Sequence, residues 1–397
     1  MAAPRFGFLP PDPEHSRRTL GLVLWCLGVI VGGALLQALF LVAPLAGAHA
    51  DRHFEAIVTG AALAFPAVVV YLTVPRLLDR YDPEPGWALL LVFVWGATAA
   101  CGFSATINSA VHASMGEVAA SVLSAPFVEE FFKALALFAM RYFWKREFDG
   151  VVDGIIYATF VALGFAAVEN VVYYARAARQ SGDALTGLFI LRGLVTPWAH
   201  PLFTSMTGIG FGVSRESTRP LLRWGAPLLG YVAAVFLHFV WNGSSVFSTA
   251  VNVPLVVILL PLWFLFVVAF LVMVVVLVQR RGRIIRQYLE DELVLGTITR
   301  EEFELTTSAF GIYRARRGPY GEVRQQLVRA TARLALSKWH AGRAMKGAMR
   351  TVSFDFIAPL REQIRALRAQ IPGAPQPAPG IPGMRLAHPF APRPGPR

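Results

Sequence analysis

The sequence predicts an all-α, polytopic integral membrane protein with about eight transmembrane helices, a small cytosolic C-terminal helical appendage and a disordered proline-rich tail. Two observations carry this fold class. Of 397 residues, 55% are hydrophobic and only 16% are charged, and the mean hydropathy is +0.52, a balance that soluble domains do not show. Apolar runs of about 20 residues, long enough to cross roughly 30 Å of hydrocarbon, recur between short polar breaks.

Lysine and arginine set the predicted orientation of these runs. With a cytoplasmic N-terminus, the inner segments hold many arginines and Lys145, whereas the outer loops hold only Arg52, Arg176 and Arg179, with Arg192 just inside a span. This asymmetry places both termini in the cytoplasm. The net charge of +12 is mostly this topology signal plus a basic tail, so nucleic acid is not an expected partner. The eight predicted spans are 19–44, 55–74, 87–107, 118–140, 154–175, 185–212, 225–247 and 253–278.

Composition divides the chain into four parts. A cytosolic segment (1–18) precedes the transmembrane domain (19–278), whose catalytic core is predicted at about 118–247. Residues 279–370 are charged, and apolar residues recur there at helical spacing, which predicts the helical appendage. Its basic face fits either the inner leaflet or a solvated packing hairpin, and we favour the hairpin. Proline and glycine dominate 371–397, which predicts disorder.

Ionisable side chains interrupt four consecutive predicted spans. A charged group at the bilayer centre costs about 2.5 to 3.5 kcal/mol, so several in one chain need a common purpose. Depths counted along the helices are compatible with one site in the outer half of the bilayer. The side chains are Glu129, Glu130 and Lys133 in 118–140, Glu169 and Asn170 in 154–175, His200 in 185–212, and His238 and Asn242 in 225–247.

Helical spacing gives these side chains an orientation. Glu129 and Lys133 lie four residues apart and share a helix face, as do His238 and Asn242, while Glu130 points about 100° away from Glu129. A lone intramembrane histidine or a Glu–Lys pair is more often a packing feature. Polar groups from four adjacent spans favour a functional site instead.

Two kinds of water activation fit this set of residues. A glutamate can take the proton of a bound water, while histidines position that water and the Asn242 amide stabilises an oxyanion. Alternatively, Glu169, His200 and His238 can hold zinc with one open position. The HExxH spacing of common zinc proteases and the GxSxG elbow of serine hydrolases are both absent from the sequence.

The ordered motifs resemble the PrsW family of intramembrane proteases. They cover about 79–242: "DRYDPEPGW", "EEFFK", "GFAAVEN", His200 in the following span, and "HFVWN". The resemblance implies a multi-pass plasma-membrane protease that cleaves a membrane-anchored protein, such as an anti-sigma factor or another signalling protein, near the outer half of the bilayer. The family is a distant relative of the CAAX prenyl-protease and bacteriocin-processing proteins, whose pattern has a histidine where Glu169 stands.

By this resemblance the catalytic set is Glu129 as general base, tuned by Glu130 and Lys133, with His200 and His238 positioning water or substrate. Asn242 would stabilise the oxyanion and Glu169 would complete the polar cluster. We favour a metal-free glutamate mechanism, and zinc is the one candidate cofactor. The competing function is a proton-coupled transporter that uses the same Glu, Lys and His groups. A third interpretation is a scaffold or receptor whose polar cluster only fixes helix packing. The sequence leaves the substrate and the oligomeric state open.

Overall fold

A computed structural model of the chain describes residues 13–42, 50–78, 81–145, 147–251, 255–346 and 354–376. Helices and short π-helical turns account for its regular structure, and the described ranges contain no strand, which confirms the predicted all-α class. The predicted disordered tail lies outside the described residues from position 377 onward. The chain divides into two compact units: unit 1 (Met1–Leu72, Gly86–Arg215, Pro227–Ile258) and unit 2 (Thr73–Pro85, Glu216–Ala226, Leu259–Arg397).

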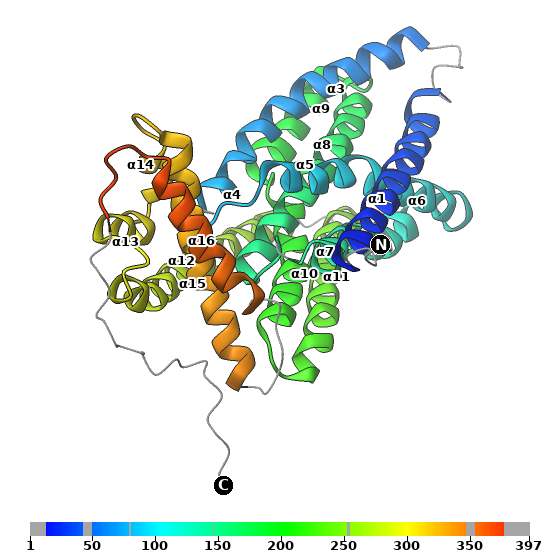
Figure 1. The fold of residues 1–397 in the computed structure, drawn as a ribbon. Helices are drawn as coiled ribbons and strands as arrows, with labels where there is room; N and C mark the ends of the chain where they lie inside the picture. Colours follow the sequence, from blue (N-terminus) through cyan, green and yellow to red (C-terminus); the bar gives the residue numbers. More distant parts are fainter. Residues whose placement is uncertain are drawn as a thin grey trace, which may run out of the picture. The chain divides into compact units, whose positions relative to one another are not determined.

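Unit 1 contains the helices that carry the predicted polar residues (Figure 1). Several of its helices begin or end in a π-helical turn, labelled η. Its elements are α1 (Pro13–Gln37), η1 (Ala38–Val42), α3 (Ala50–Tyr71), α5 (Gly86–Trp95), η2 (Gly96–Ala100), α6 (Cys101–Met115), η3 (Ala119–Ser124), α7 (Ala125–Phe143), α8 (Val151–Ala178), α9 (Gly182–Phe189), η4 (Ile190–Val195), α10 (Ala199–Glu216) and most of α11 (Pro220–Val251).

Helix α8 is the centre of unit 1. Its most apolar stretch is 89% buried, against 17% in α1 and in α3, so protein rather than lipid surrounds α8. Glycines permit this enclosure, because they let helix backbones touch. A Cβ on Gly164 would lie 2.1 Å from the Phe93 carbonyl oxygen, and one on Gly208 would lie 2.2 Å from that of Gly154. Helices α5 and α10 therefore approach α8 more closely than any side chain would allow.

Six helices among the described residues are long and apolar enough to cross a membrane, so the predicted count of eight is not confirmed. The two predicted spans outside this set are 118–140 and 185–212, which carry Glu129 and His200. Helix α7 has only 19 residues and includes two glutamates, a lysine and an arginine. The other segment is interrupted between η4 and α10, around Pro197. The six are Ser16–Val42, Ala50–Arg76, Gly86–Met115, Val151–Ala178, Pro220–Ser244 and Pro261–Val294.

Unit 2 has its own apolar core and a network of ion pairs. Ile285 and Leu289 pack with Phe303, Leu334 and Ile364 from neighbouring helices. Helix α12 runs without a break from the apolar sequence into the charged one, and so across the predicted boundary at 279. The elements are α4 (Thr73–Leu78), most of α12 (Leu255–Val294), α13 (Arg300–Thr307), α14 (Gly311–Ala315), α15 (Gly321–Lys346) and α16 (Phe354–Ala369).

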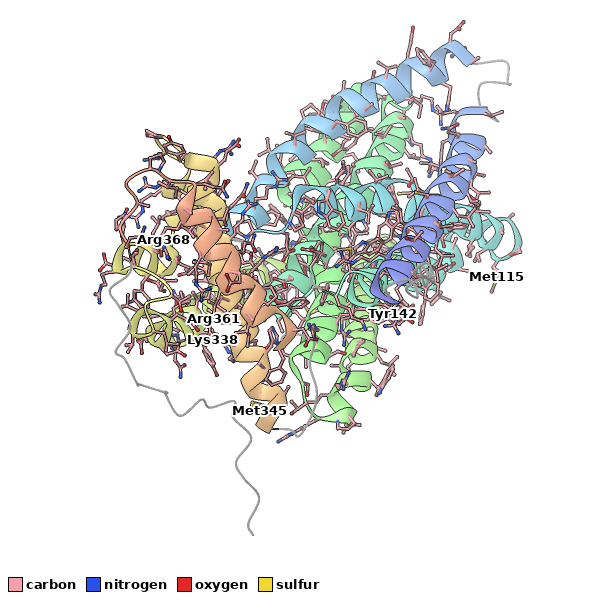
Figure 2. All side chains as sticks on the ribbon, in the orientation of Figure 1. Met115, Tyr142, Lys338, Met345, Arg361 and Arg368 are labelled. Atoms are coloured by element: carbon pink, nitrogen blue, oxygen red, sulfur yellow. The ribbon has the colours of Figure 1, made fainter. Side chains whose placement is uncertain are left out.

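Buried charges hold α12, α15 and α16 together within unit 2. The Glu292 carboxylate accepts hydrogen bonds from Lys338 at 2.9 Å and from Arg361 at 2.5 Å. Arg368 donates to Glu302, whose side chain also completes the capping box of α13 with Thr299. Figure 2 labels Lys338, Arg361 and Arg368 on these helices. The appendage is thus a packed helical body fastened by ion pairs.

Candidate active site

The polar site begins on one buried stripe of α7. Glu129, Glu130 and Lys133 are 6%, 0% and 0% exposed, although each carries an ionisable group. The i, i+3 and i, i+4 spacings bring both carboxylates near the lysine ammonium. The apolar residues one turn after Lys133, Ala136 and Leu137, continue the stripe into the core of unit 1. The helix therefore buries its charges because its apolar residues require the same face to be buried.

Glu130 is fully satisfied by hydrogen bonds. Its Oε1 accepts from Lys133 Nζ at 2.9 Å and from His238 Nδ1 at 3.2 Å. Its Oε2 accepts from the Thr204 hydroxyl at 2.8 Å. Three donors from α7, α10 and α11 thus converge on one carboxylate, which makes Glu130 the junction between these helices.

Glu129 is held much more loosely than its neighbour. Its Oε1 lies 3.5 Å from the Asn108 amide nitrogen, at the edge of hydrogen-bonding distance. Its Oε2 is buried without a hydrogen-bond partner among the described residues. That oxygen lies 3.7 Å from Lys133 Nζ and 3.8 Å from His238 Nε2. A buried carboxylate oxygen without a donor is costly, so this atom is the one most available to a ligand.

The two histidines stand next to each other, with ring centroids 5.1 Å apart. The hydrogen-bond network assigns their tautomers. His238 donates through Nδ1 to Glu130, which leaves the Nε2 lone pair facing Glu129. His200 accepts from Lys133 at Nδ1, 3.1 Å away, and donates through Nε2 to Glu169 Oε2 at 2.9 Å. Phe203 stacks on the His238 ring with centroids 5.0 Å apart and restricts its rotation.

Glu169 is neutralised by an arginine that the sequence analysis did not assign to the site. Arg192, in η4, donates to the Glu169 carboxylate and, at 2.7 Å, to the Asn170 side-chain oxygen. Its guanidinium also covers the Tyr173 ring, 4.1 Å from the centroid. A single arginine near the end of an apolar segment resembles a topology signal. The carboxylate of Glu169 and the amide of Asn170, near the C-terminal end of the preceding span, were the available clue to its partner.

A cavity of about 530 Å³ reaches both Glu129 and Glu169. Its walls come from the η1 end of the first helix, from α6 and η3, and from α7 and α8. Polar groups on the lining include Ser104, Asn108 and Ser121, and apolar ones include Phe165 and Val168. The volume lies within the range typical of small-molecule and peptide side-chain sites. The loosely held carboxylate of Glu129 therefore faces a space that a substrate can occupy.

Three of these side chains could share a metal ion. Glu129, His200 and His238 each offer a ligand atom, and these atoms lie within 4.8 Å of one another. Two imidazoles and a carboxylate are a catalytic zinc set, and the unpartnered Glu129 oxygen fits that role. The zinc set predicted from sequence had Glu169 instead, but Arg192 engages that carboxylate. The geometric triad therefore contains Glu129 where the sequence prediction has Glu169.

Asn242 and Asn108 complete the comparison with the predicted site. The Asn242 amide donates to the Ser121 backbone carbonyl at 2.8 Å, which ties α11 to η3 rather than to the carboxylates. Asn108 was not predicted, because it falls one residue beyond the assigned end of its span. Ser124 donates to its side-chain oxygen at 2.8 Å, so the amide nitrogen points at Glu129.

These features define a class of protein: a polytopic membrane protein with a hydrolase-type polar centre enclosed by its helices. Comparison with known proteins identifies the family. The sequence model described as "PrsW family intramembrane metalloprotease" matches residues 84–278. Protease PrsW of Geobacillus kaustophilus is 31% identical over 180 residues, which are 44% of this chain and 74% of that protein. The chain belongs to the PrsW family of intramembrane metalloproteases.

Two further relatives give a similar result. Protease PrsW of Clostridioides difficile and that of Bacillus subtilis are each 30% identical over 151 residues, or 37% of this chain. Those residues cover 62% and 66% of the two relatives. No solved structure matches the chain. The family membership confirms the resemblance seen in the motifs and supports a protease function.

Proposed function

We propose that this chain is an intramembrane endopeptidase that hydrolyses a peptide bond of a membrane-anchored protein, with Glu129 as general base. The single observation that carries the proposal is that Glu129 lines a cavity while its buried Oε2 has no hydrogen-bond partner among the described residues. A protein that used the cluster only for packing would satisfy this oxygen, as it satisfies both oxygens of Glu130.

The reaction follows from how the two acids differ. Glu129 takes a proton from water in the cavity, the water oxygen attacks the scissile carbonyl, and the proton passes to the leaving amine. Glu130 keeps its three hydrogen bonds and so holds Lys133, Thr204 and His238 in place. His238 Nε2 lies 3.8 Å from Glu129 Oε2, and from this position it orients the water that Glu129 activates.

Glu169 and Arg192 form the second wall of the site. Through Glu169 Oε2, the pair fixes the His200 ring so that its Nδ1 faces Lys133. Arg192 neutralises an acid that would otherwise add a negative charge next to Glu129. Asn242 acts at one remove, by holding η3 against α11.

The family's description as metalloproteases gives this proposal a second form, in which Glu129 is a metal ligand instead of the general base. Where zinc is bound, Glu129, His200 and His238 would hold it, and the ion would polarise the carbonyl and acidify water. Lys133 Nζ, 3.1 Å from His200 and 3.7 Å from Glu129, would then stand beside the cation. The Lys133 ammonium and the zinc ion would repel each other, because both are positively charged. In the metal-free form the ammonium only balances the charge of the carboxylates.

The proposed location is the plasma membrane with both termini in the cytoplasm. The excess of lysine and arginine on the predicted inner segments supports this orientation. A substrate anchored in the same membrane, of the anti-sigma-factor type that the resemblance implies, would present its cleaved bond near the outer half of the bilayer.

The test compares new protein N-termini in membranes of cells that express the wild type, Glu129→Gln or His238→Ala. We expect N-termini in single-span membrane proteins that appear with the wild type and are lost with both variants. Glu55→Gln makes the same chemical change at an exposed position of α3 and should behave as the wild type. The proposal is wrong if either site variant keeps the cleavage products. Loss of solute flux with intact cleavage patterns would support the transporter instead.

A further inference from the structure

Unit 2 carries an exposed patch of arginine and aromatic side chains that the proposed protease activity does not use. It lies in and around α14, in the sequence "SAFGIYRARRGPYGEVR" that begins at Ser308. Phe310, Tyr313 and Tyr320 are 57%, 39% and 50% exposed. Three exposed arginines lie between Tyr313 and Tyr320 in the chain: Arg314, Arg316 and Arg317. These six residues are called the α14 patch below.

The positive charges of the α14 patch are not neutralised by acidic side chains among the described residues. None of its three guanidinium groups has an ion pair or side-chain hydrogen bond among the described residues. Other exposed arginines of unit 2 do: Arg300 pairs with Glu304, Arg324 with Glu301, and Arg365 with Glu362. Between positions 308 and 332, Glu322 is the one acid against five arginines. The patch is therefore a local excess of positive charge.

The backbone around Tyr320 has an unusual conformation. Tyr320 has φ = 58°, a left-handed conformation that is unfavourable for a bulky residue, and Gly318 two residues earlier has φ = 86°. Tyr320 therefore has a strained backbone, although its side chain is half exposed and gains little from burial. Beneath the patch, Ile312 and Ala315 pack against Val328 of α15, so the segment is anchored from below.

One contact places the patch beside a membrane span. The Tyr313 hydroxyl donates to the Arg76 carbonyl at 3.1 Å. Arg76 is the last residue of the candidate span Ala50–Arg76, and its own side chain is exposed. Arginine with tyrosine and phenylalanine is the composition that binds the interface of an anionic bilayer, where cations meet phosphate and rings enter the headgroup layer.

We propose that the α14 patch is a binding site for anionic phospholipid headgroups in the leaflet where the span Ala50–Arg76 ends. Arg314, Arg316 and Arg317 hold the phosphates, and Phe310 and Tyr320 insert at headgroup depth. In the orientation proposed above, this is the cytoplasmic leaflet. The binding attaches the α14 segment to the bilayer surface, in addition to the membrane span that α12 supplies to unit 2.

The experiment uses the full-length protein in nanodiscs of phosphatidylcholine alone or mixed with phosphatidylglycerol. Hydrogen–deuterium exchange is followed at residues 310–320. In the wild type we expect phosphatidylglycerol to slow this exchange on the order of tenfold, and salt to reverse the effect by screening. The triple variant Arg314→Gln/Arg316→Gln/Arg317→Gln should lose the response.

Two further variants make the result specific. Arg300→Gln/Arg324→Gln/Arg365→Gln removes the same net charge from paired arginines and should keep the response. Tyr320→Asn removes the ring and introduces a residue that tolerates positive φ. This variant should therefore fold, and phosphatidylglycerol should slow its exchange less than in the wild type. Equal exchange in both kinds of nanodisc overturns the proposal, as does an equal loss in the two triple variants. Protection by glycerol phosphate or by an acidic peptide without phosphatidylglycerol also overturns it, in favour of a soluble anion or an acidic protein.

Discussion

Replacing Lys133 with methionine tests whether the buried charges act as one network. Methionine has an unbranched side chain of similar length to lysine, but the variant leaves Glu130 without its ammonium partner. Both side chains of this pair are 0% exposed and their charged atoms are 2.9 Å apart. Two unit charges at that distance attract by about 6 kcal/mol at an effective dielectric constant of about 20. Because desolvation offsets part of this, we expect a net loss of about 3 to 5 kcal/mol in the free energy of unfolding.

The double variant Glu130→Gln/Lys133→Met gives the sharper measurement. It removes both charges, so no unpaired Glu130 carboxylate stays buried, and it should be about 2 kcal/mol more stable than Lys133→Met. Unfolding by sodium dodecyl sulfate in mixed micelles, followed by circular dichroism, measures these differences. Lys145→Met is the control, because it makes the same chemical change at a half-buried position outside the Glu129, Glu130 and Lys133 cluster. It should change stability by no more than about 0.5 kcal/mol.

Two outcomes would refute this reasoning. If Lys133→Met unfolds at the same detergent fraction as the wild type, the ammonium does not stabilise the carboxylates. If the losses of Lys133→Met and of Glu130→Gln, each measured alone, simply add in the double variant, the residues are not coupled. Either result would remove the physical basis for treating α7, α10 and α11 as joined at Glu130.

Two other predictions follow from the same structure. Gly164→Ala should cost about 1 to 3 kcal/mol in the same unfolding assay, because its Cβ would lie 2.1 Å from the Phe93 carbonyl oxygen. Gly187→Ala has open space around it and should be neutral or stabilising, and equal effects at both glycines would contradict the packing argument. Zinc content, measured by mass spectrometry after purification without chelator, should fall in Glu129→Gln and His238→Ala if these residues are ligands. Wild type without zinc but with protease activity would assign the metal-free mechanism.

Much of the fold was predictable because membrane burial leaves a strong pattern in composition. The all-α class follows from the length and spacing of apolar runs, and the structure confirms it. The number of spans was harder to predict. The segments around Glu129 and His200 are apolar on average, yet one contains several charges and the other is broken near Pro197. Averages over about 20 residues hide such interruptions.

The site was predictable at the level of residue types but not of atoms. The cost of burying charge indicated that four helices contribute to one cluster. In the structure, two of the predicted residues do meet, because Glu129 Oε2 lies 3.8 Å from His238 Nε2. Counting depth along a helix locates a side chain only to about one helical turn. That precision cannot decide whether Glu129 or Glu169 shares a metal with the histidines. It also cannot reveal that Arg192 forms an ion pair with Glu169, since Arg192 lies in a π-helical turn.

The difference between Glu129 and Glu130 favours chemistry over packing as the reason for the cluster. They are adjacent in sequence, and both are buried in the same helix, so neither burial nor composition separates them. Their hydrogen bonds do, because donors from three helices satisfy Glu130 while one oxygen of Glu129 has none. A scaffold explains the first acid completely and leaves the second unexplained. A hydrolase needs both: one carboxylate to fix the helices and one that is free to exchange a proton with water in the cavity.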